Sequence, residues 1–584
     1  MGHGKPPAPT EKTTPLHCRH NRHRKLTECS LFSRASGTHR SGMLRSHAIR
    51  ALALLLVSAL AVGGATTYPT PNLDSTPVGE AKPVWLGGVK FVNKGLVGVG
   101  QLAVGALDDR GDSLGSFSSF KIDLKTWRRH PDGSYGGTLF TLPDRGYNVH
   151  GTIDYPARLQ RFELTFRPDY GRDPVLTPNL KLVFKATRTL LDFKGNVTTG
   201  LDPHEDTLQG FSPVPVRHGK FAVDAEGLGL HPDGTFYLSD EYGATIFHLS
   251  PHGRMLGLLT PPNAFLPRFE AKKFSGFTTD IKAVEVQTGG RRDNQGYEGV
   301  DVTPDGRYLV AMLQGALRQD CPTEEENNRA YARLVVYDLQ PGSTPHQPVG
   351  HYLIELPTFN TAGLGKPANK SAAQSELMAL SRTDFLILAR DSSGSGSGKS
   401  DYAPEAAAVG YAAAPHIYKS VLLVSTRAAT NLVGTTYESG YVPAVRGSGP
   451  TLAPAYGLTA ATGTEFVNLL NPVQLARFGL DLNAVGPAGV AKAAAAGHRV
   501  GMTSPASLSA KWEALAIVSC LDRAYPDDYF LLVGNDNDFL TAEGAMLGKS
   551  YDATSSQPGM EIVETPNRIL VYRVTLPGYA PPVR

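Results

Sequence analysis

Acidic residues recur at the open ends of predicted β-hairpins along this 584-residue chain. In the clearest copy Glu226 begins an apolar run, residues 231–234 form a Pro-Asp-Gly turn, and a second run ends at Asp240 and Glu241. In an antiparallel hairpin the start of the first strand and the end of the second lie together, opposite the turn. Hairpins arranged around one axis would therefore gather their acids at one mouth.

Three further hairpins repeat this pattern. Their first strands begin at Glu298, Glu376 and Glu513, and their second strands end near Gln314, Asp391 and Asp536. Aligning the hairpin starts with Gln101 as the first member gives spacings of 125, 72, 78 and 137 residues. The two middle spacings fit one large four-stranded blade each. The wider spacings indicate a missed blade or a substantial insertion.

The repeated acids form an oxygen-rich set without His or Cys, which suits Ca²⁺, a hard cation with roughly six to eight oxygen ligands. The predicted metal ligands are Glu226, Glu298, Asp144, Asp391, Asp536 and Asp538. The predicted catalytic residues are Asp240 and Glu241, as metal ligand or general base, with Arg145 and Arg390. The arginines could compensate the crowded carboxylates or hold an anionic substrate group by a bidentate contact.

A structural interpretation of the same acids remains open. A repeated Glu at a strand start can accept hydrogen bonds from neighbouring backbone amides and lock one blade to the next. An Asp after a strand commonly caps a turn. The chain has no complete Gly-x4-Gly-Lys-Ser/Thr phosphate-binding loop and no zinc spacing that would favour another chemistry.

Short apolar runs bounded by turn residues predict an all-β protein. Repeated β-meander units must stack to bury both faces, and radial closure into a β-propeller also protects the strand edges. We expect six blades, with five or seven as alternatives, together with loop insertions and one short helix. Asn471 followed by Pro472 predicts the start of that helix. The strand at 568–574 is expected to pair near 84–92 and close the ring.

The N-terminal region is predicted to lie outside the fold. Residues 1–42 are basic and polar, and we interpret them as a leader or as sequence that precedes the true start at Met43. Residues 43–65 have the basic, apolar and small-residue regions of a signal peptide. The apolar run 51–62 is short for a membrane span, although a signal anchor is the alternative. We expect one secreted domain at 66–584 that has no membrane span and is a monomer.

Charge and cysteine usage agree with export. Residues 1–65 carry ten Lys or Arg and two acids, so the formal charge of +3 becomes −5 for residues 66–584. No nucleic-acid partner is therefore expected. We predict a disulfide between Cys321 and Cys520, with two buried thiols as the alternative. Asn196 and Asn369 begin N-glycosylation sequons.

Several blocks of the sequence carry a family resemblance. They are residues 142–146, 224–228, 239–243, 296–300, 312–317 and 534–538. In these blocks the chain resembles the phytase-like family described as "esterase-like activity of phytase", over about residues 85 to 577. The resemblance implies a β-propeller and a hydrolase of phosphate or carboxylate esters. A more distant likeness is to calcium-dependent propeller phytases, which hold several Ca²⁺ ions in a cleft of basic and acidic groups.

The expected function is a secreted hydrolase that acts on a small phosphate or carboxylate ester, assisted by Ca²⁺ at an acidic channel mouth. One alternative is a lactonase-like propeller that uses one channel Ca²⁺ to polarise a carbonyl. The other is a secreted binding propeller whose acids are structural, since propellers host many unrelated functions.

Overall fold

The computed structural model describes residues 65–581 with gaps. The gaps are 149–150, 176, 270–286, 324–325, 341–343, 362–366, 395–416, 483, 486, 498, 500, 503 and 554–563. These residues belong to one compact unit, Val62–Arg584. The predicted leader at 1–42 and all but the last residue of the predicted signal peptide at 43–65 lie outside the described residues.

Three four-stranded antiparallel sheets and one nine-stranded sheet dominate the described residues. The nine-stranded sheet divides into two blades where β2 and β6 meet at the single parallel pair Gly100–Leu180, which gives five blades, here called blades 1 to 5. Blade 1 contains β3 (Ser119–Arg129), β4 (Tyr135–Leu142), β5 (Arg158–Phe166) and β6 (Leu180–Thr189). Blade 2 contains β9 (Ala225–Leu230), β10 (Phe236–Asp240), β11 (Thr245–Leu249) and β12 (Met255–Leu259). Blade 3 contains β15 (Tyr297–Val302), β16 (Tyr308–Leu313), β17 (Tyr331–Asp338) and β18 (Gly350–Glu355). Blade 4 contains β21 (Ala373–Ala379), β22 (Asp384–Arg390), β23 (Lys419–Ser425) and β26 (Gly463–Asn468). Blade 5 contains β29 (Lys511–Ser519), β30 (Asp528–Asp536), β33 (Arg568–Thr575) and β2 (Val89–Gln101).

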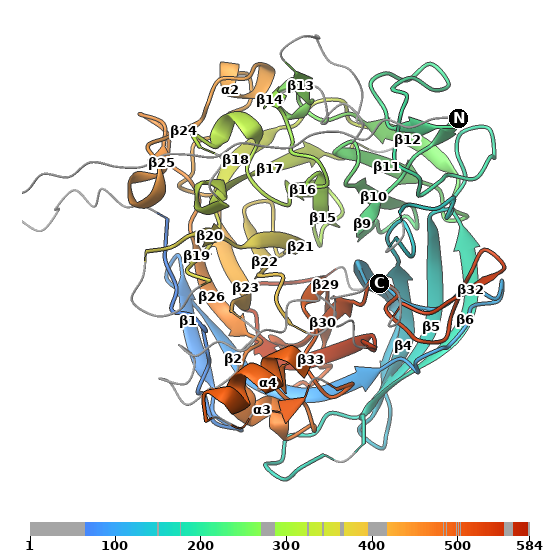
Figure 1. Ribbon diagram of the computed structural model, residues 1–584, viewed down its shortest axis with the longest axis vertical. Helices are drawn as coiled ribbons and strands as arrows, with labels where there is room; N and C mark the ends of the chain where they lie inside the picture. The colour runs from blue at the N-terminus through green and yellow to red at the C-terminus, as the bar shows by residue number, and fades with distance from the viewer. Residues whose placement is uncertain are drawn as a thin grey trace, which may run out of the picture. The chain divides into compact units, whose positions relative to one another are not determined.

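The blades follow one another around a common axis (Figure 1). Their innermost strands β3, β9, β15, β21 and β29 lie side by side, and β29 returns to β3. Blade 5 joins the two ends of the domain because β33 pairs with β2, with Gln101 opposite Arg568. A short strand β1 (Lys82–Leu86) extends this sheet as the partner of β2. The predicted β-propeller and its closure by the last strand are confirmed.

The expected number of six blades is corrected to five among the described residues. The wide spacing between Glu376 and Glu513 is an insertion rather than a missed blade. It contains α2 (Thr436–Ser439), β24 (Val445–Arg446), β25 (Ala453–Pro454), α3 (Pro472–Ala476), β27 (Ala484–Val485), α4 (Pro487–Ala495) and β28 (Gly501–Met502). Gln101 ends β2, the outermost strand of blade 5, so it does not begin a hairpin; the inner strand of blade 1 begins at Ser119.

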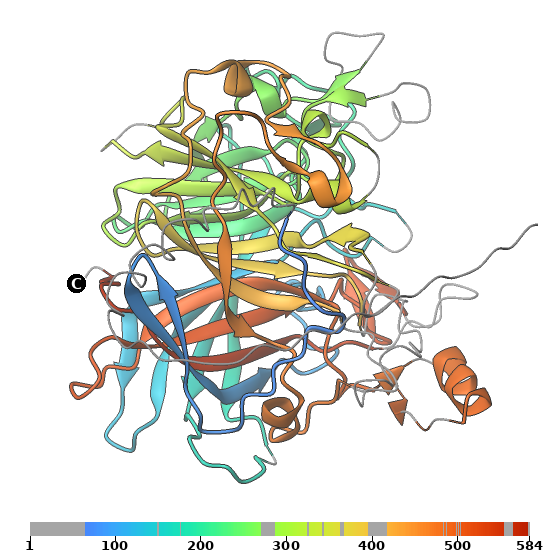
Figure 2. The ribbon, with the colours of Figure 1, turned by 90° about the vertical axis from the view of Figure 1, so that its left-hand side faces the viewer.

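The predicted helix start is confirmed at α3. The Asn471 side chain accepts a hydrogen bond from the Gln474 amide at 3.0 Å, and Pro472 occupies the first helical position. The expectation of only one helix is wrong, because α2 and α4 also form. Ala has the highest helix propensity, and the Ala-rich sequence of α4 follows this preference. Figure 2 shows α4, the orange-red helix at the lower right, projecting beyond the sheets.

Short elements occur in the connections between the blades and in the loops within blades 3, 4 and 5. They are β7 (Val216–Arg217), β8 (Lys220–Phe221), β13 (Arg268–Phe269), β14 (Gln287–Gly289), β19 (Thr358–Phe359), β20 (Lys370–Ser371), β31 (Gly544–Met546), β32 (Lys549–Tyr551) and the 3₁₀ helices η1 (Asn263–Phe265), η3 (Arg318–Asp320), η4 (Glu326–Arg329) and η5 (Gly449–Thr451).

The core lies between neighbouring blades. All six residues of β16 are buried, whereas burial alternates with exposure along β5 of blade 1. An inner strand is covered on both faces by adjacent sheets, so it contains apolar residues at consecutive positions. In a strand with one solvent-exposed face, buried and exposed residues alternate with a period of two. Ile246 of blade 2 and Leu309 of blade 3 belong to one such interblade cluster.

β-bulges occur where the hairpin acids were predicted. Glu298 lies in a bulge between Tyr297 and Gly299, and Glu513 lies in an equivalent bulge. The pairing of β9 with β10 is also irregular around Glu226. A bulge bends the strand and changes the direction of a side chain. These bulges direct carboxylates away from the regular pleat.

The glycine after Glu226 has a packing reason. A Cβ atom on Gly227 would lie 2.5 Å from the Glu298 carbonyl oxygen, because blades 2 and 3 approach each other closely there. The Ser239 hydroxyl donates to the same carbonyl at 2.7 Å and accepts from the Gly227 amide at 2.7 Å. Glu226 therefore supplies a carboxylate at the open end of the hairpin, and Gly227 allows the close contact between blades 2 and 3.

The predicted disulfide between Cys321 and Cys520 is wrong. Both residues are buried free thiols. Cys321 follows η3 in the connection within blade 3, and Cys520 follows β29 in blade 5. A disulfide requires Cα atoms within about 7 Å of each other, which sequence alone cannot show. Burial raises the pKa of the Cys520 thiol to about 12.

Candidate functional site

Two groups of three acids lie at the mouth of the ring where the inner hairpins open. Cluster A consists of Asp144, Asp536 and Asp538, and cluster B consists of Asp224, Glu226 and Glu241. Within each cluster, one carboxylate oxygen from every member lies within 4.8 Å of the others. The clusters are neighbours: Arg145, which follows Asp144 of cluster A in the sequence, forms an ion pair with Asp224 of cluster B. The predicted convergence of acids at one mouth therefore occurs.

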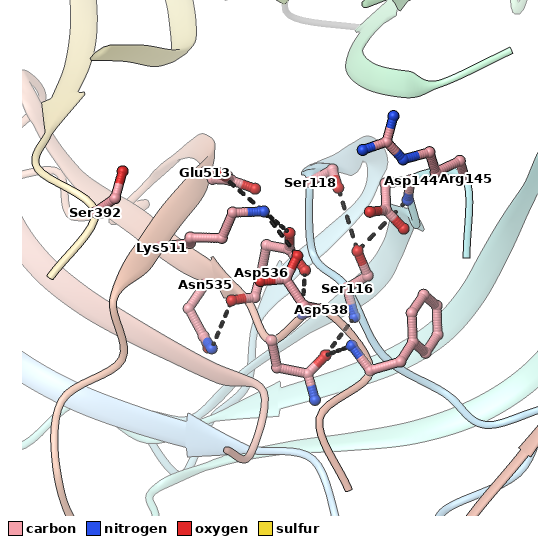
Figure 3. Close-up of polar contacts among 12 residues, drawn as sticks. Ser116, Ser118, Asp144, Arg145, Ser392, Lys511, Glu513, Asn535, Asp536 and Asp538 are labelled. Atoms are coloured by element: carbon pink, nitrogen blue, oxygen red, sulfur yellow. Dashed lines mark hydrogen bonds and ion pairs between the residues drawn. The ribbon is translucent and has the colours of Figure 1, made fainter. Parts of the chain in front are cut away.

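Lys511 compensates cluster A (Figure 3). Its Nζ atom lies 2.8 Å from Asp536 Oδ2 and 2.8 Å from Asp538 Oδ1. Burial alone would raise the pKa of Asp536, but the Lys511 ammonium and its hydrogen bond lower it below the ordinary value. The pKa of Asp144 is raised well above the ordinary value by burial and then by the charge of Asp536.

Cluster B has less compensation. Arg145 Nη1 lies 2.8 Å from Asp224 Oδ2, and the guanidinium lies 5.5 Å from the centre of the Tyr242 ring. Among the described residues, no Lys or Arg forms an ion pair with Glu226 or Glu241. Burial, and then the charge of Asp224, raise the pKa of Glu241 to about 8. Glu226 and Glu241 thus have no ion pair among the described residues, although the charges of Arg145 and Lys511 partly offset the rise in the pKa of Glu241.

Further polar groups extend cluster B across the mouth. Gln314 Nε2 donates to Glu241 Oε1 at 3.1 Å and to Glu298 Oε1. Burial raises the pKa of Glu298 well above the ordinary value, and the charge of Glu241 adds to this effect. Glu513 forms an ion pair with Arg390, and burial raises its pKa to about 7. Arg145 and Arg390 therefore lie at the predicted mouth, each bound to an acid.

Two predicted site residues have structural partners instead. Asp240 is fully buried and accepts hydrogen bonds from the Asp224 amide at 3.0 Å and the Gly243 amide at 2.7 Å. Asp391 accepts from two backbone amides and lies 3.0 Å from Lys419 Nζ. Neither residue belongs to cluster A or B. The structural interpretation fits these two residues, and Asp240 supports cluster B by holding the backbone of Asp224.

Sequence reasoning missed two members of the site, Asp224 and Lys511. Asp224 immediately precedes β9 and was passed over in favour of Glu226, although it lies in one of the blocks that carry the family resemblance. Lys511 lies two residues before Glu513 on β29. The bulge at Glu513 interrupts the period of two along β29, so the strand pattern did not identify this cation.

Cluster B fits the requirements of a Ca²⁺ site. Ca²⁺ binds oxygen ligands at about 2.3–2.6 Å, so ligand oxygens on opposite sides of one ion lie about 5 Å apart. The 4.8 Å limit within cluster B satisfies this geometry without rearrangement. Its three members are buried carboxyl groups, and Arg145 forms an ion pair with only one of them, Asp224. Together they offer six carboxyl oxygens, each of which can act as a metal ligand. The carboxylate oxygens of cluster A lie within the same distance of one another, but two of its three acids, Asp536 and Asp538, already form ion pairs with Lys511.

The two predicted glycosylation sites lie on exposed surface. Asn196 Nδ2 donates to Asp192 at 3.1 Å, and Asn369 Nδ2 donates to Thr361 at 2.9 Å. Both asparagine side chains are exposed. Their modification stays a prediction.

Comparison with known proteins identifies relatives. The model of a family described as "Phytase-like: Esterase-like activity of phytase" matches residues 130–443. A curated protein of Arthroderma benhamiae, named "Uncharacterized secreted protein", is 31% identical over 529 residues, which cover 84% of this chain and 96% of that protein. The N-terminal domain of Nup159 is 8% identical, covering 88% of this chain and 100% of that chain, with a TM-score of 0.24 that is too low to support an argument.

The described residues were also searched for membrane-spanning helices. None of their helices combines the length and the apolar character that crossing a bilayer requires.

Proposed function

Because the chain belongs to the phytase-like family described as "esterase-like activity of phytase", we propose that it is a secreted hydrolase of phosphate or carboxylate esters, assisted by Ca²⁺. Secretion is supported by the signal peptide predicted at 43–65 and by the name of the Arthroderma benhamiae relative. The active site in this proposal is the mouth that contains clusters A and B.

The observation that carries the proposal is the uncompensated pair of acids in cluster B. Glu226 and Glu241 are buried beside Asp224, and burial and mutual repulsion raise their pKa values. Perturbed acids that converge in this way are common at functional sites. A cation would relieve the repulsion, so binding Ca²⁺ is the simplest use of this arrangement.

Each residue at the mouth has a role in the proposed reaction. Asp224 and Glu226 hold the metal, which when bound neutralises ester oxygens and lowers the pKa of an attacking water. Glu241 accepts the proton of that water through Oε2, while Gln314 holds its Oε1 atom at 3.1 Å. Arg145 lies at the edge of the cluster and orients the anionic group of the substrate through its guanidinium.

The proposal is tested by measuring phosphate release from phytate by purified protein 66–584, with Ca²⁺ and with a chelator. We expect release that requires Ca²⁺ and that falls by roughly 100-fold or more in Glu241→Gln, because a general base and its electrostatic contribution are lost. Asp233→Asn is the matched control, since Asp233 is exposed in the turn at the other end of the same hairpin. Equal release by Glu241→Gln would exclude this active site.

Carboxylate esters and lactones are measured in parallel. Turnover of these substrates without phosphate release would assign the site to carboxylic rather than phosphoric esters.

A non-catalytic function is the second candidate, because Asp240 and Asp391 serve the backbone rather than a ligand. In a secreted binding propeller Ca²⁺ would have a structural role. The expected result is then an increase in Tm with Ca²⁺ and no turnover of any ester.

A further inference from the structure

The inner strands of blades 3, 4 and 5 each have a β-bulge at the mouth, and blade 4 has a different kind of residue in it. The register of β15 with β16 places Glu298 in the bulge of blade 3. The register of β29 with β30 places Glu513 in the bulge of blade 5. In blade 4 the register changes between Gln374 and Glu376, so the extra residue is Ser375. Ser375 therefore has the backbone position at which the blades on either side present a carboxylate.

Glu376, which the sequence pattern aligned with those acids, lies one residue further along β21 and has other partners. Its carboxylate accepts a hydrogen bond from the Ser119 hydroxyl of blade 1 and one from the Leu377 amide at 2.9 Å. Blade 4 thus offers a hydroxyl at the position where blades 3 and 5 offer an acid.

The Ser375 hydroxyl is buried without a partner. Ser375 is 1% exposed, and its Oγ atom has no hydrogen-bond partner among the described residues. The buried Ser239 hydroxyl of blade 2, in contrast, donates to the Glu298 carbonyl and accepts from the Gly227 amide, both at 2.7 Å. Because an unpaired buried hydroxyl costs free energy, its retention in a folded protein points to a ligand that supplies the missing bond.

On the side of blade 3, the backbone next to Ser375 is tied to a residue of the mouth. The Gln374 amide donates to the Gln314 carbonyl at 2.8 Å, and the Gln314 side chain donates to Glu298. The Gln374 side chain lies between the blades, since a Cβ atom on Gly299 would be 2.7 Å from its Nε2 atom. Ser375 is thus the residue at this strand start that shares its position with the acids of the mouth.

On the side of blade 5, Arg390 supplies positive charge. Arg390 pairs with Ala373, two residues before Ser375, and is 4% exposed. Its guanidinium forms an ion pair with Glu513 and donates from Nη1 to Ser392 at 2.9 Å, while its Nε atom has no partner among the described residues. A guanidinium has five N–H donors, so Arg390 retains a donor for a further acceptor.

A hydroxyl beside a guanidinium suits an anionic oxygen better than a carboxylate at the same position would. A carboxylate would repel the anion, whereas a hydroxyl is neutral and donates a hydrogen bond that the charge of the acceptor strengthens. The reacting group of a phosphate ester is anionic before water attacks it, whereas the carbonyl oxygen of a carboxylic ester is neutral. The mouth position of blade 4 therefore favours a phosphate group.

We propose that Ser375 is a substrate-binding residue whose hydroxyl donates a hydrogen bond to an anionic oxygen of the substrate's phosphate group, beside Arg390. The inference rests on the proposed function, because it places the ester at the same mouth. Cluster B and Ser375 then act on the substrate from different blades.

Calorimetric titration of protein 66–584 with inorganic phosphate, in the presence of Ca²⁺, tests the contact directly. Ser375→Ala should weaken phosphate binding at least about tenfold, because a hydrogen bond to a charged oxygen is lost. Ser381→Ala is the matched control, since Ser381 binds Asp384 in the turn at the other end of the same hairpin, and it should leave phosphate binding unchanged. Unchanged binding in Ser375→Ala, or no phosphate binding by the unmodified protein, would overturn the proposal.

Thermal unfolding without phosphate separates ligand binding from a structural role. Ser375→Ala removes a hydroxyl that has no partner, so the Tm should stay the same or rise. Ser239→Ala removes a hydroxyl with two hydrogen bonds, so the Tm should fall. A fall in Ser375→Ala as large as that in Ser239→Ala would contradict the proposal, because it would assign the Ser375 hydroxyl to the stability of blade 4.

Phytate turnover by the same variants distinguishes this inference from the proposed function. Ser375→Ala should increase KM at least about fivefold, in line with its weaker phosphate binding. If the unmodified protein binds phosphate through Ser375 but releases none from phytate, the binding role stands and the hydrolase proposal fails. If turnover requires Ca²⁺ and Ser375→Ala leaves KM and phosphate affinity unchanged, the hydrolase proposal stands and the role of Ser375 fails.

Discussion

Clusters A and B differ in one cation, although each contains three acids at the same mouth. In cluster A, Lys511 lies 2.8 Å from two of the three acids. In cluster B, Arg145 pairs with Asp224 alone. A cation that enters cluster A must displace an ammonium belonging to the chain, whereas cluster B offers two carboxyl groups without an ion pair among the described residues. The placement of the chain's own cations, more than the number of acids, decides which cluster is suited to a metal.

The protonation of the clusters differs accordingly. The pKa of Asp536 in cluster A is lowered by Lys511 against the effect of burial, so this acid is ionised at neutral pH. The pKa of Glu241 in cluster B is raised to about 8, so it carries a proton in most molecules at neutral pH when no metal is bound. Binding a metal at cluster B should therefore release protons.

The largest expected effect is the loss of Ca²⁺ binding in Glu226→Gln. This change removes a charged ligand from cluster B, and ester turnover should fall by roughly 100-fold or more. Calorimetric titration with Ca²⁺ and the phytate assay measure the two effects. Asp538→Asn, in cluster A, is the matched control. If the control abolishes Ca²⁺ binding while Glu226→Gln retains it, the roles of the two clusters are reversed.

Lys511→Met should make cluster A resemble cluster B. The acids left without their cation are expected to reduce the free energy of unfolding in a chelator by about 1–3 kcal/mol, below the cost of breaking a fully buried pair because the Lys511 side chain is 32% exposed. Ca²⁺ should restore this loss by binding the vacated cluster. Denaturant unfolding with and without Ca²⁺ measures both effects, and a loss that Ca²⁺ leaves unchanged would show that cluster A cannot hold the ion.

The pH dependence of stability should reveal the protonated acids of cluster B. Glu241 has a pKa of about 8 in the folded protein against 4.5 ordinarily, so between these values the folded protein holds a proton that the unfolded chain releases. The free energy of unfolding therefore decreases as the pH rises through this range, because the folded protein must lose a proton that the unfolded chain has already released. The Tm in a chelator is expected to fall between about pH 5 and pH 8. Thermal unfolding across this range measures the fall.

Ca²⁺ should reduce the fall in Tm with rising pH, because the metal binds and stabilises the ionised carboxylates. Glu241→Gln provides the control, since it removes the titrating group. A Tm that rises with pH in the chelator would contradict a raised pKa in cluster B.

The smallest expected effect concerns the cation of cluster B. Asn294 Oδ1 accepts a hydrogen bond from Arg145 Nη1 at 2.7 Å at an exposed position. Asn294→Ala should increase KM by roughly twofold to fivefold with little change in kcat, because Arg145 loses one orienting contact. Steady-state kinetics separate the two constants. A fall in kcat without a change in KM would assign Asn294 to the chemical step instead.

The inner hairpins were predictable because their signals are local. Pro-Asp-Gly turns and apolar runs identified β9–β10 and β15–β16 directly, and the geometry of a hairpin placed Glu226 and Glu298 at the open end. The number of blades was not predictable in the same way. The two insertions before and after β26, between β23 and β29, contain helices and short strands whose combined length resembles that of a blade.

The sequence could not show which acids face the site and which accept hydrogen bonds from the backbone. Glu226 and Asp240 belong to the same hairpin and have similar chemistry, yet Asp240 accepts from backbone amides while Glu226 joins cluster B. The residues of cluster A come from separate blades: Lys511 and Asp536 lie in blade 5, whereas Asp144 lies in the loop after β4 of blade 1. Cys321 and Cys520 failed as a predicted pair for the same reason, since the blades place them apart.

The sequence by itself determined the all-β character, the inner hairpins, the closing strand and the collection of acids at one mouth, because turn chemistry and strand periodicity act over a few residues. Only the tertiary structure decided the ring of five blades, the pairing of Lys511 with cluster A and the carboxyl groups of cluster B that have no ion pair among the described residues. These features depend on distances between side chains from different blades. Burial, ion pairing and pKa follow from those distances.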